Sequence, residues 1–173
     1  MSYKANSTTY GGKTKSQIAS LTGMSQGDSV YNTDINRIEY YTGSIWANED
    51  LVVCVIDSGG GTFSEGQCCH WVNDGTYQKA VALSQEVNSG EFAGIVYRGG
   101  TGAGTEIVVA WKGIYPVKFE GATTANFGVS LSSTTNGDNL SEGSVSVGHF
   151  GIVLETIGAA GNAKVLIGGI ETF

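Results

Sequence analysis

Beyond Gly27 the chain alternates short β-prone runs with turns that are rich in glycine, asparagine and aspartate. Short runs of β-branched and aromatic residues that are bounded by such turns are typical of β-strands. The first three runs are Val30–Thr33, Arg37–Thr42 and Ser44–Trp46. Because they are short and closely spaced, they predict a small β-meander over residues 28–49.

A continuous apolar run, Leu51–Ile56, follows the meander and ends at Asp57-Ser58 and three glycines. Such a run predicts a strand that is buried on both faces. Seven further β-type segments lie between turns: Gln67–Val72, Gly94–Arg98, Glu106–Trp111, Ile114–Phe119, Phe127–Leu131, Gly151–Glu155 and Lys164–Ile167. Many short strands without a βαβ rhythm predict an all-β domain over residues 50–173, a small sandwich or barrel-like fold of short antiparallel strands.

The two-residue link Lys112-Gly113 predicts a hairpin between Glu106–Trp111 and Ile114–Phe119. The sole proline, Pro116, lies in the second of these segments. Because proline has no backbone N–H, it predicts that this strand lies at a sheet edge.

The last two strands, Ile152–Glu155 and Lys164–Ile167, are joined by a glycine-rich loop and predict a second hairpin. Helical patterns are confined to Lys79–Val87 and Lys13–Leu21. Both segments are too short to be stable as isolated helices.

Residues 1–27 are mostly Ser, Thr, Gly, Asn and Gln, and their charged side chains are Lys4, Lys13 and Lys15. Apolar side chains are sparse there, so we expect an extended, polar, cationic arm. The three lysines are candidate interaction residues, since an arm of this charge suits acidic patches on a partner protein.

The 173 residues carry 9 basic and 16 acidic side chains, a net charge of −7. This charge repels phosphate groups, so we expect no nucleic acid partner. No apolar run approaches the length of a membrane-spanning helix, so we expect no membrane association. The polar start Met1–Lys4 lacks the apolar segment of a secretory signal, and we expect synthesis in a cytoplasm.

The three cysteines are Cys54, Cys68 and Cys69. An odd number without framework spacing predicts reduced thiols. The segment Cys68-Cys69-His70 has a metal-like composition, but consecutive residues on a strand point to opposite faces and do not converge on one ion. We therefore expect no metal site and no cofactor.

Three aromatic residues, Tyr40, Tyr41 and Trp46, cluster in the meander and are further candidate interaction residues. Aromatic side chains anchor interfaces and can stack on sugars. The alternative is that they fill the core of the meander, which has little other apolar material. Both interpretations stay open.

An enzymatic alternative comes from Val55-Ile56-Asp57-Ser58-Gly59, two apolar residues followed by Asp-Ser-Gly. This is the signature of aspartic proteases, and a retropepsin-like homodimer would pair two copies of Asp57 around one water. Val165–Gly168 offers the downstream apolar-glycine element, although at a longer separation than in compact retropepsins. A polar turn after a strand is the simpler interpretation, and we expect no catalytic residues.

Two stretches resemble phage virion proteins. Residues 27–46, GDSVYNTDINRIEYYTGSIW, resemble a short β-meander that recurs in tail-fibre and other virion surface proteins. Residues 50–173 resemble the small β-rich decoration (cement) proteins of tailed-phage capsids in their pattern of short strands separated by glycine-rich turns. The segments that carry this second resemblance are Phe92–Tyr97, Glu106–Lys118, Val147–Thr156 and Lys164–Ile167.

The second resemblance implies a structural virion protein, commonly a homotrimer, that binds the major capsid protein on the outer surface of the head and stabilises it. The first resemblance implies an alternative, a tail-fibre, collar or receptor-binding appendage that could contact a glycan.

Overall fold

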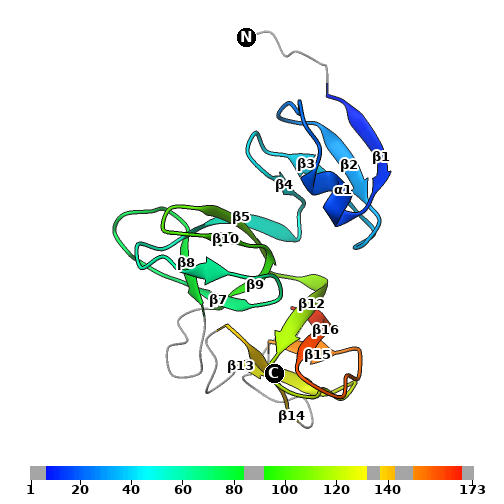
Figure 1. Cartoon of the computed structure of the whole chain (residues 1–173), viewed down its shortest axis with the longest axis vertical. Coiled ribbons are helices and arrows are strands. Elements are labelled where there is room, and N and C mark those ends of the chain that lie inside the picture. The colour runs from blue at the N-terminus through cyan, green and yellow to red at the C-terminus, as the bar shows by residue number, and fades with distance from the viewer. Residues whose placement is uncertain (1–6, 84–91, 132–136, 143–149, 169–173) are drawn as a thin grey trace. The chain divides into compact units, whose positions relative to one another are not determined.

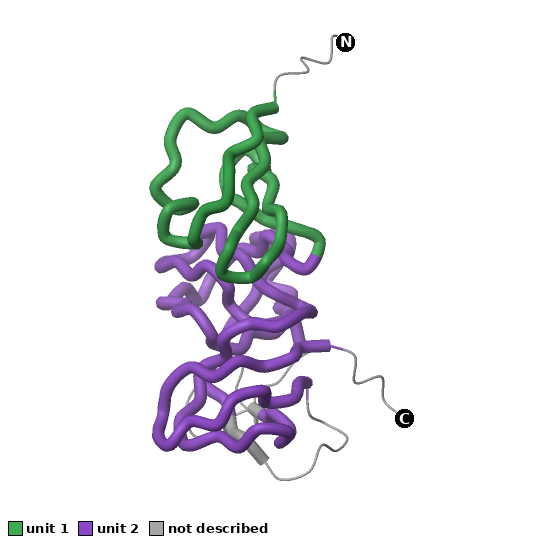
Figure 2. The backbone as a smooth tube through the Cα atoms, turned by 90° about the vertical axis from the view of Figure 1, so that its right-hand side faces the viewer, with its two compact units in different colours: residues 1–49 green, residues 50–173 purple. Residues whose placement is uncertain are grey.

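The computed structural model describes residues 7–83, 92–131, 137–142 and 150–168, and the chain divides into two compact units (Figures 1 and 2). Unit 1 is Met1–Glu49 and unit 2 is Asp50–Phe173. The described residues are mostly strands, which confirms the predicted all-β class.

Unit 1 is a four-stranded sheet with one short helix. In chain order its elements are β1 (Thr9–Lys13), α1 (Lys15–Ala19), β2 (Ser29–Asn32), β3 (Arg37–Tyr41) and β4 (Trp46–Ala47). The strand order is β1-β2-β3-β4, with β1 parallel to β2 and the other neighbours antiparallel. The meander predicted from the sequence therefore forms, and it gains a fourth strand from the N-terminal segment.

The expectation of an extended arm over residues 1–27 is wrong for the described part of that segment. Thr14 caps α1 by accepting a hydrogen bond from the backbone N–H of Gln17, and the Gln17 side chain accepts one from the N–H of Thr14. Ile18 is fully buried with Val30 and Trp46 in the core of unit 1. Ile18, three partly buried side chains packed against the same core (Tyr10, Leu21 and Met24) and a capping box thus hold a segment whose composition is polar.

Unit 2 begins with a closed five-stranded barrel, in the order β11-β5-β8-β7-β9. It closes because β11 pairs with both β5 and β9. Two short strands, β6 and β10, pair beside it. The bounds are β5 (Leu51–Ile56), β6 (Thr62–Phe63), β7 (Cys68–Trp71), β8 (Ala80–Leu83), β9 (Phe92–Arg98), β10 (Gly100–Thr101) and β11 (Glu106–Ala110).

A second closed barrel follows in unit 2, in the order β12-β14-β13-β15-β16. Its buried face is formed by alternate residues of β12 and β16, such as Val117 and Val165. The predicted hairpin at the end of the chain is confirmed, because β15 and β16 pair in antiparallel register. The bounds are β12 (Gly113–Phe119), β13 (Gly128–Leu131), β14 (Asn139–Glu142), β15 (Gly151–Val153) and β16 (Gly161–Ile167).

The hairpin predicted across Lys112-Gly113 is wrong. Ala110 at the end of β11 pairs with Leu51 and with Ile95, so both edges of β11 are occupied. The strand after the link belongs instead to the second barrel, where β12 pairs with β16 along its length and with β14 at Phe119. The two-residue link therefore carries the chain from one barrel to the next.

The helix predicted over Lys79–Val87 is also wrong where the structure describes it. Residues Ala80–Leu83 form β8, which lies between β5 and β7 in the first barrel. The remainder of that predicted helix lies outside the described residues. Pairing with two neighbouring strands outweighs the weak helical preference of this short apolar stretch.

Gly66 joins the two barrels through its backbone. Its N–H donates to the carbonyl of Val96 in β9 (2.8 Å), and its carbonyl accepts from the N–H of Lys118 in β12 (2.9 Å). Its φ is +84°, and a Cβ at this position would lie 2.8 Å from the nitrogen of Lys118. Only glycine allows this close approach without strain.

Candidate functional site

The sheet of unit 1 has one covered face and one open face. Val30 and Glu39 are cross-strand neighbours, and both are fully buried on the covered face. Tyr31 and Ile38 are the next pair in register, and they are 42% and 49% exposed. Tyr40 is two residues beyond Ile38 on the same strand and is 53% exposed. Because side chains alternate along a strand, the open face presents three large apolar groups.

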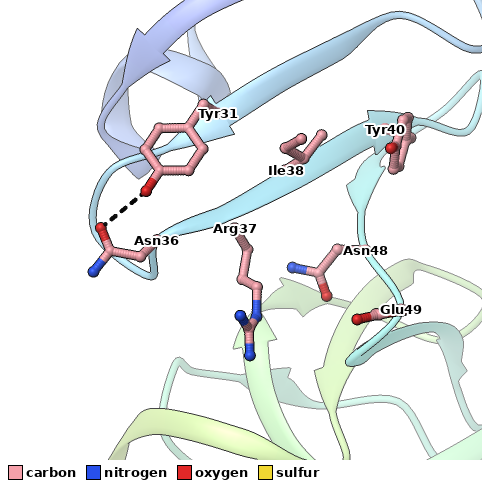
Figure 3. A pocket seen from close by; sticks show the side chains of 7 residues that line it. All are labelled: Tyr31, Asn36, Arg37, Ile38, Tyr40, Asn48 and Glu49. Atoms are coloured by element: carbon pink, nitrogen blue, oxygen red, sulfur yellow. Dashed lines mark hydrogen bonds between the residues drawn. The ribbon is translucent and has the colours of Figure 1, made fainter.

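A pocket of about 430 Å³ lies on this open face (Figure 3). We call it the unit 1 pocket. Its lining combines the three exposed apolar side chains with polar groups from the β2–β3 turn, from the first residue of β3 and from the chain after β4. The lining residues are Tyr31, Asn36, Arg37, Ile38, Tyr40, Asn48 and Glu49.

One hydrogen bond orients a ring of the pocket. The hydroxyl of Tyr31 donates to Oδ1 of Asn36 across 3.3 Å, as drawn in Figure 3. Asn36 occupies the left-handed region with a φ of 52°, which asparagine tolerates better than most residues. The turn of the hairpin therefore places the amide against the end of the Tyr31 ring.

The aromatic residues singled out from the sequence separate into core and surface. Trp46 is only 2% exposed, and its ring packs against Tyr10 and Tyr41 at centroid distances of 6.0 and 5.4 Å. Trp46 is therefore a core residue, and Tyr41 is half-buried beside it. Tyr40 alone of the three lies on the open face. The partners of Tyr40 there, Tyr31 and Ile38, were missed, although the alternation along β2 and β3 could have revealed them.

Two of the candidate lysines, Lys13 and Lys15, lie in the folded part of unit 1 and not in a free cationic arm. Lys13 ends β1 and Lys15 begins α1, and both side chains are half-buried; Lys4 lies outside the described residues. The backbone N–H of Lys15 donates to Oδ2 of Asp34 across 2.7 Å. Residues 1–49 contain four basic and four acidic side chains, so the net charge of −7 resides entirely in unit 2.

Unit 2 carries a second apolar surface on the outside of its second barrel. Ile114 of β12 and Ile152 of β15 both lie opposite Leu166 of β16, so the three form one row across the sheet. The next row places Lys164 opposite Pro116, and the carbonyl of Lys164 accepts the N–H of Leu154. We call these six residues the apolar patch. Its members are Ile114, Pro116, Ile152, Leu154, Lys164 and Leu166.

The apolar patch is accessible. Ile114, Leu154 and Leu166 are 53%, 42% and 38% exposed. Five of its six side chains are apolar, and the sixth is a cation on a unit whose net charge is negative. Apolar groups that gather in adjacent rows on a surface mark a protein contact more often than scattered ones do.

Asp57, the residue of the protease alternative, lies in the turn after β5. The carboxylate of Asp74 holds this turn by accepting the N–H of Ser58 (2.9 Å) and those of Thr76 and Tyr77. These hydrogen bonds, that from Tyr77 most of all, lower the pKa of Asp74. Val165–Gly168, the proposed downstream element, begins in β16 of the second barrel, whereas Asp57 belongs to the first.

The three cysteines are all free thiols and are all buried. Within the described ranges, no group of three or more His, Cys, Asp or Glu side chains is arranged to hold a metal ion. The described part of the chain also holds no helix that is long and apolar enough to cross a membrane.

No protein-family model matches the chain, and no curated protein matches it. Among solved structures, its fold is similar to that of the N base of head fibre gp8.5 from bacteriophage phi29, with a TM-score of 0.52 and 8% sequence identity. The similarity covers 68% of this chain and 94% of the phi29 chain. Because unit 1 holds only 49 of the 173 residues, a match of this extent must include much of unit 2. At this identity the comparison establishes a shared fold.

Proposed function

We propose that this protein is a structural component of a phage virion that binds the major capsid protein on the outer surface of the head and stabilises the shell. The similarity to the base of a phage head fibre carries the proposal, because it spans nearly all of that chain. The resemblance of residues 50–173 to capsid decoration proteins supports it independently.

The apolar patch is the surface that we assign to the capsid contact. Buried centres of protein interfaces are depleted of charged residues and enriched in apolar ones. Ile114, Leu166 and Ile152 provide such a centre, and Lys164 provides one cation beside it. The remainder of unit 2 carries a large excess of acidic side chains, which keeps free copies from associating non-specifically.

We also propose that the protein acts as a homotrimer. Three copies held together would present three patches to the shell at once. The second and third contacts then form at a high effective concentration, so a modest affinity for each contact is sufficient. Stabilisation follows because a protein that binds only the intact shell shifts the equilibrium away from its disruption.

The test uses phage heads that lack this protein. Purified full-length protein should bind them in a co-sedimentation assay and raise the temperature at which they release DNA. Leu166→Asp should weaken binding at least about tenfold, because it places a carboxylate in the centre of the patch. Asn162→Asp is the matched control, since it adds the same charge at an exposed position of the same strand.

Absence of binding by the unaltered protein would refute the capsid role. Equal losses for Leu166→Asp and Asn162→Asp would show that added charge, and not the patch, controls binding. Native mass spectrometry of the full chain tests the trimer separately, and a monomer at micromolar concentration would refute that part.

A tail-fibre, collar or receptor-binding appendage is the second candidate function. The unit 1 pocket favours this function, because Tyr31 and Tyr40 expose their rings to solvent and do not fill the core. Immunogold labelling of intact virions distinguishes the two functions. Label over the whole head supports decoration, and label confined to the neck or tail supports an appendage.

A further inference from the structure

The open face of unit 1 differs in chemistry from the apolar patch of unit 2. Two tyrosines and one isoleucine form its apolar part, and amide, guanidinium and carboxylate groups lie along one side of them (Figure 3). We propose that the unit 1 pocket is a saccharide-binding site. This assignment goes beyond capsid binding and does not depend on it, since the pocket and the patch belong to different units.

The aromatic part of the pocket suits the weakly polar C–H faces of a sugar ring. Tyr31 and Tyr40 keep about half of their surface exposed, whereas Trp46 of the same unit is buried. Tyrosine combines an apolar ring with a polar hydroxyl, so it can stack on a ring face and also hydrogen-bond to it. Ile38 lies between the two tyrosines in Figure 3 and completes the apolar floor.

The rim of the pocket suits hydroxyl groups. Asn36 and Asn48 place amides in the lining, which can donate and accept, Arg37 places a guanidinium there and Glu49 places a carboxylate. A sugar hydroxyl is both donor and acceptor, so a rim of mixed groups matches it. One cation and one anion also leave the lining without net charge, which favours a neutral ligand over a phosphate or a polyamine.

The pocket is largely formed before any ligand binds. Tyr31 and Ile38 are held in register by the β2–β3 pairing, and Asn36 accepts a hydrogen bond from Tyr31. Oδ1 of Asn32 accepts the N–H of Asp34 across 3.0 Å and braces the same turn. A preformed site loses less conformational entropy on binding, which matters for ligands that bind weakly.

The size and the rim favour a saccharide over a protein partner. A volume of about 430 Å³ lies within the range of small-molecule sites, roughly 300–1,000 Å³. Glutamate is depleted from the centres of protein contacts, but Glu49 lines this pocket directly. A short glycan, bound through one or two rings, fits both observations.

The experiment applies the full-length protein to a glycan array and follows each positive glycan by isothermal titration. Tyr40→Ala should weaken binding at least about tenfold, because it removes one of the two stacking rings. Trp111→Ala is the matched control, since it removes an aromatic ring that is 48% exposed in unit 2. Tyr31→Phe keeps the ring and removes its hydrogen bond to Asn36, so it should weaken binding less than Tyr40→Ala does.

Circular dichroism confirms that each variant is folded; Tyr40 is more than half exposed, so its loss should leave the fold intact. No glycan bound at millimolar concentration would overturn the assignment. Equal binding by Tyr40→Ala and the unaltered protein would overturn it too, as would loss of capsid binding by Tyr40→Ala with glycan binding unchanged. None of these results bears on whether Leu166→Asp detaches the protein from heads.

Discussion

The thiol of Cys68 in the first barrel of unit 2 donates a hydrogen bond to Oδ1 of Asn139 in the second, with Sγ and Oδ1 2.8 Å apart. Both side chains are fully buried. Nδ2 of Asn139 donates in turn to the carbonyl of Lys118 across 2.9 Å. One amide therefore satisfies two polar groups at the junction of the barrels, and it supplements the backbone joint at Gly66.

Replacing Asn139 should destabilise unit 2. In Asn139→Ala the carbonyl of Lys118 and the thiol of Cys68 lose their partner, which lowers the free energy of unfolding by about 1–3 kcal/mol. Urea denaturation followed by near-ultraviolet circular dichroism measures the change. Cys68→Ser, which keeps a donor for Asn139, should be less harmful. An unchanged urea midpoint for Asn139→Ala would show that the bridge contributes nothing.

The buried thiols should not react in the folded protein. Burial raises the pKa of Cys54 to about 12 and raises the pKa values of Cys68 and Cys69 well above the ordinary value. Because the thiolate is the reactive form, iodoacetamide at pH 8 should add no mass to the folded chain. In denaturant all three cysteines should be modified, as intact-mass spectrometry will show. Rapid modification without denaturant would contradict the burial of these side chains.

Acid should weaken unit 1 through Asp28. Its carboxylate accepts the N–H groups of Ser25 (2.9 Å) and Thr8 (2.7 Å), and these hydrogen bonds lower its pKa below the ordinary 3.8. A carboxyl whose pKa is lower in the folded state stabilises the fold above its unfolded pKa. That stabilisation is lost as the pH falls through the folded value.

Asp28→Asn tests this linkage. The amide can accept only with its oxygen, so unit 1 of the variant should be less stable than that of the unaltered protein at pH 6. The stability of the variant should also fall less between pH 6 and pH 3, because the titrating carboxyl is gone. Thermal unfolding monitored by NMR signals of unit 1 provides the measurement. Identical pH profiles for the two proteins would exclude Asp28 as the titrating group.

The same substitution at two tryptophans should change stability to very different extents. Trp46→Ala removes the largest side chain from the core of unit 1 and should lower stability by about 3–5 kcal/mol, enough to unfold a unit of this size. Trp111→Ala should change stability by less than about 1 kcal/mol, since its ring is 48% exposed and contacts Lys112 at the surface. Limited proteolysis of the full chain provides the measurement. Cleavage within residues 1–49 should become faster in Trp46→Ala and stay unchanged in Trp111→Ala.

A milder change at Trp46 provides a control for that prediction. Among the described residues its buried indole N–H has no hydrogen-bond partner. Trp46→Phe keeps an aromatic ring and removes this unsatisfied donor, so it should be tolerated much better than Trp46→Ala. Equal damage from the two substitutions would mean that ring volume does not account for the role of Trp46.

The strands were predictable where a run of strand-forming residues is bounded by turn residues. Leu51–Ile56 is continuous and apolar and is followed by a glycine turn, and β5 has the same bounds. Strand β8 was missed, because Ala80–Leu83 has no glycine, proline, asparagine or aspartate directly at either end. Ala80–Leu83 becomes a strand because β5 and β7 pair with it on either side. A single-sequence pattern does not contain that information.

The amino-acid sequence by itself determined the all-β class and the alternation of faces along each strand, because both follow from local residue preferences. Tertiary structure alone decided which strands pair and which face is covered. Because both edges of β11 are paired, β12 pairs in a second barrel. In unit 1, α1 packs on the face that holds Trp46, whereas Tyr31 and Tyr40 are exposed on the other face. Alternation tells which side chains share a face, but only the packing of distant segments determines which face meets the solvent.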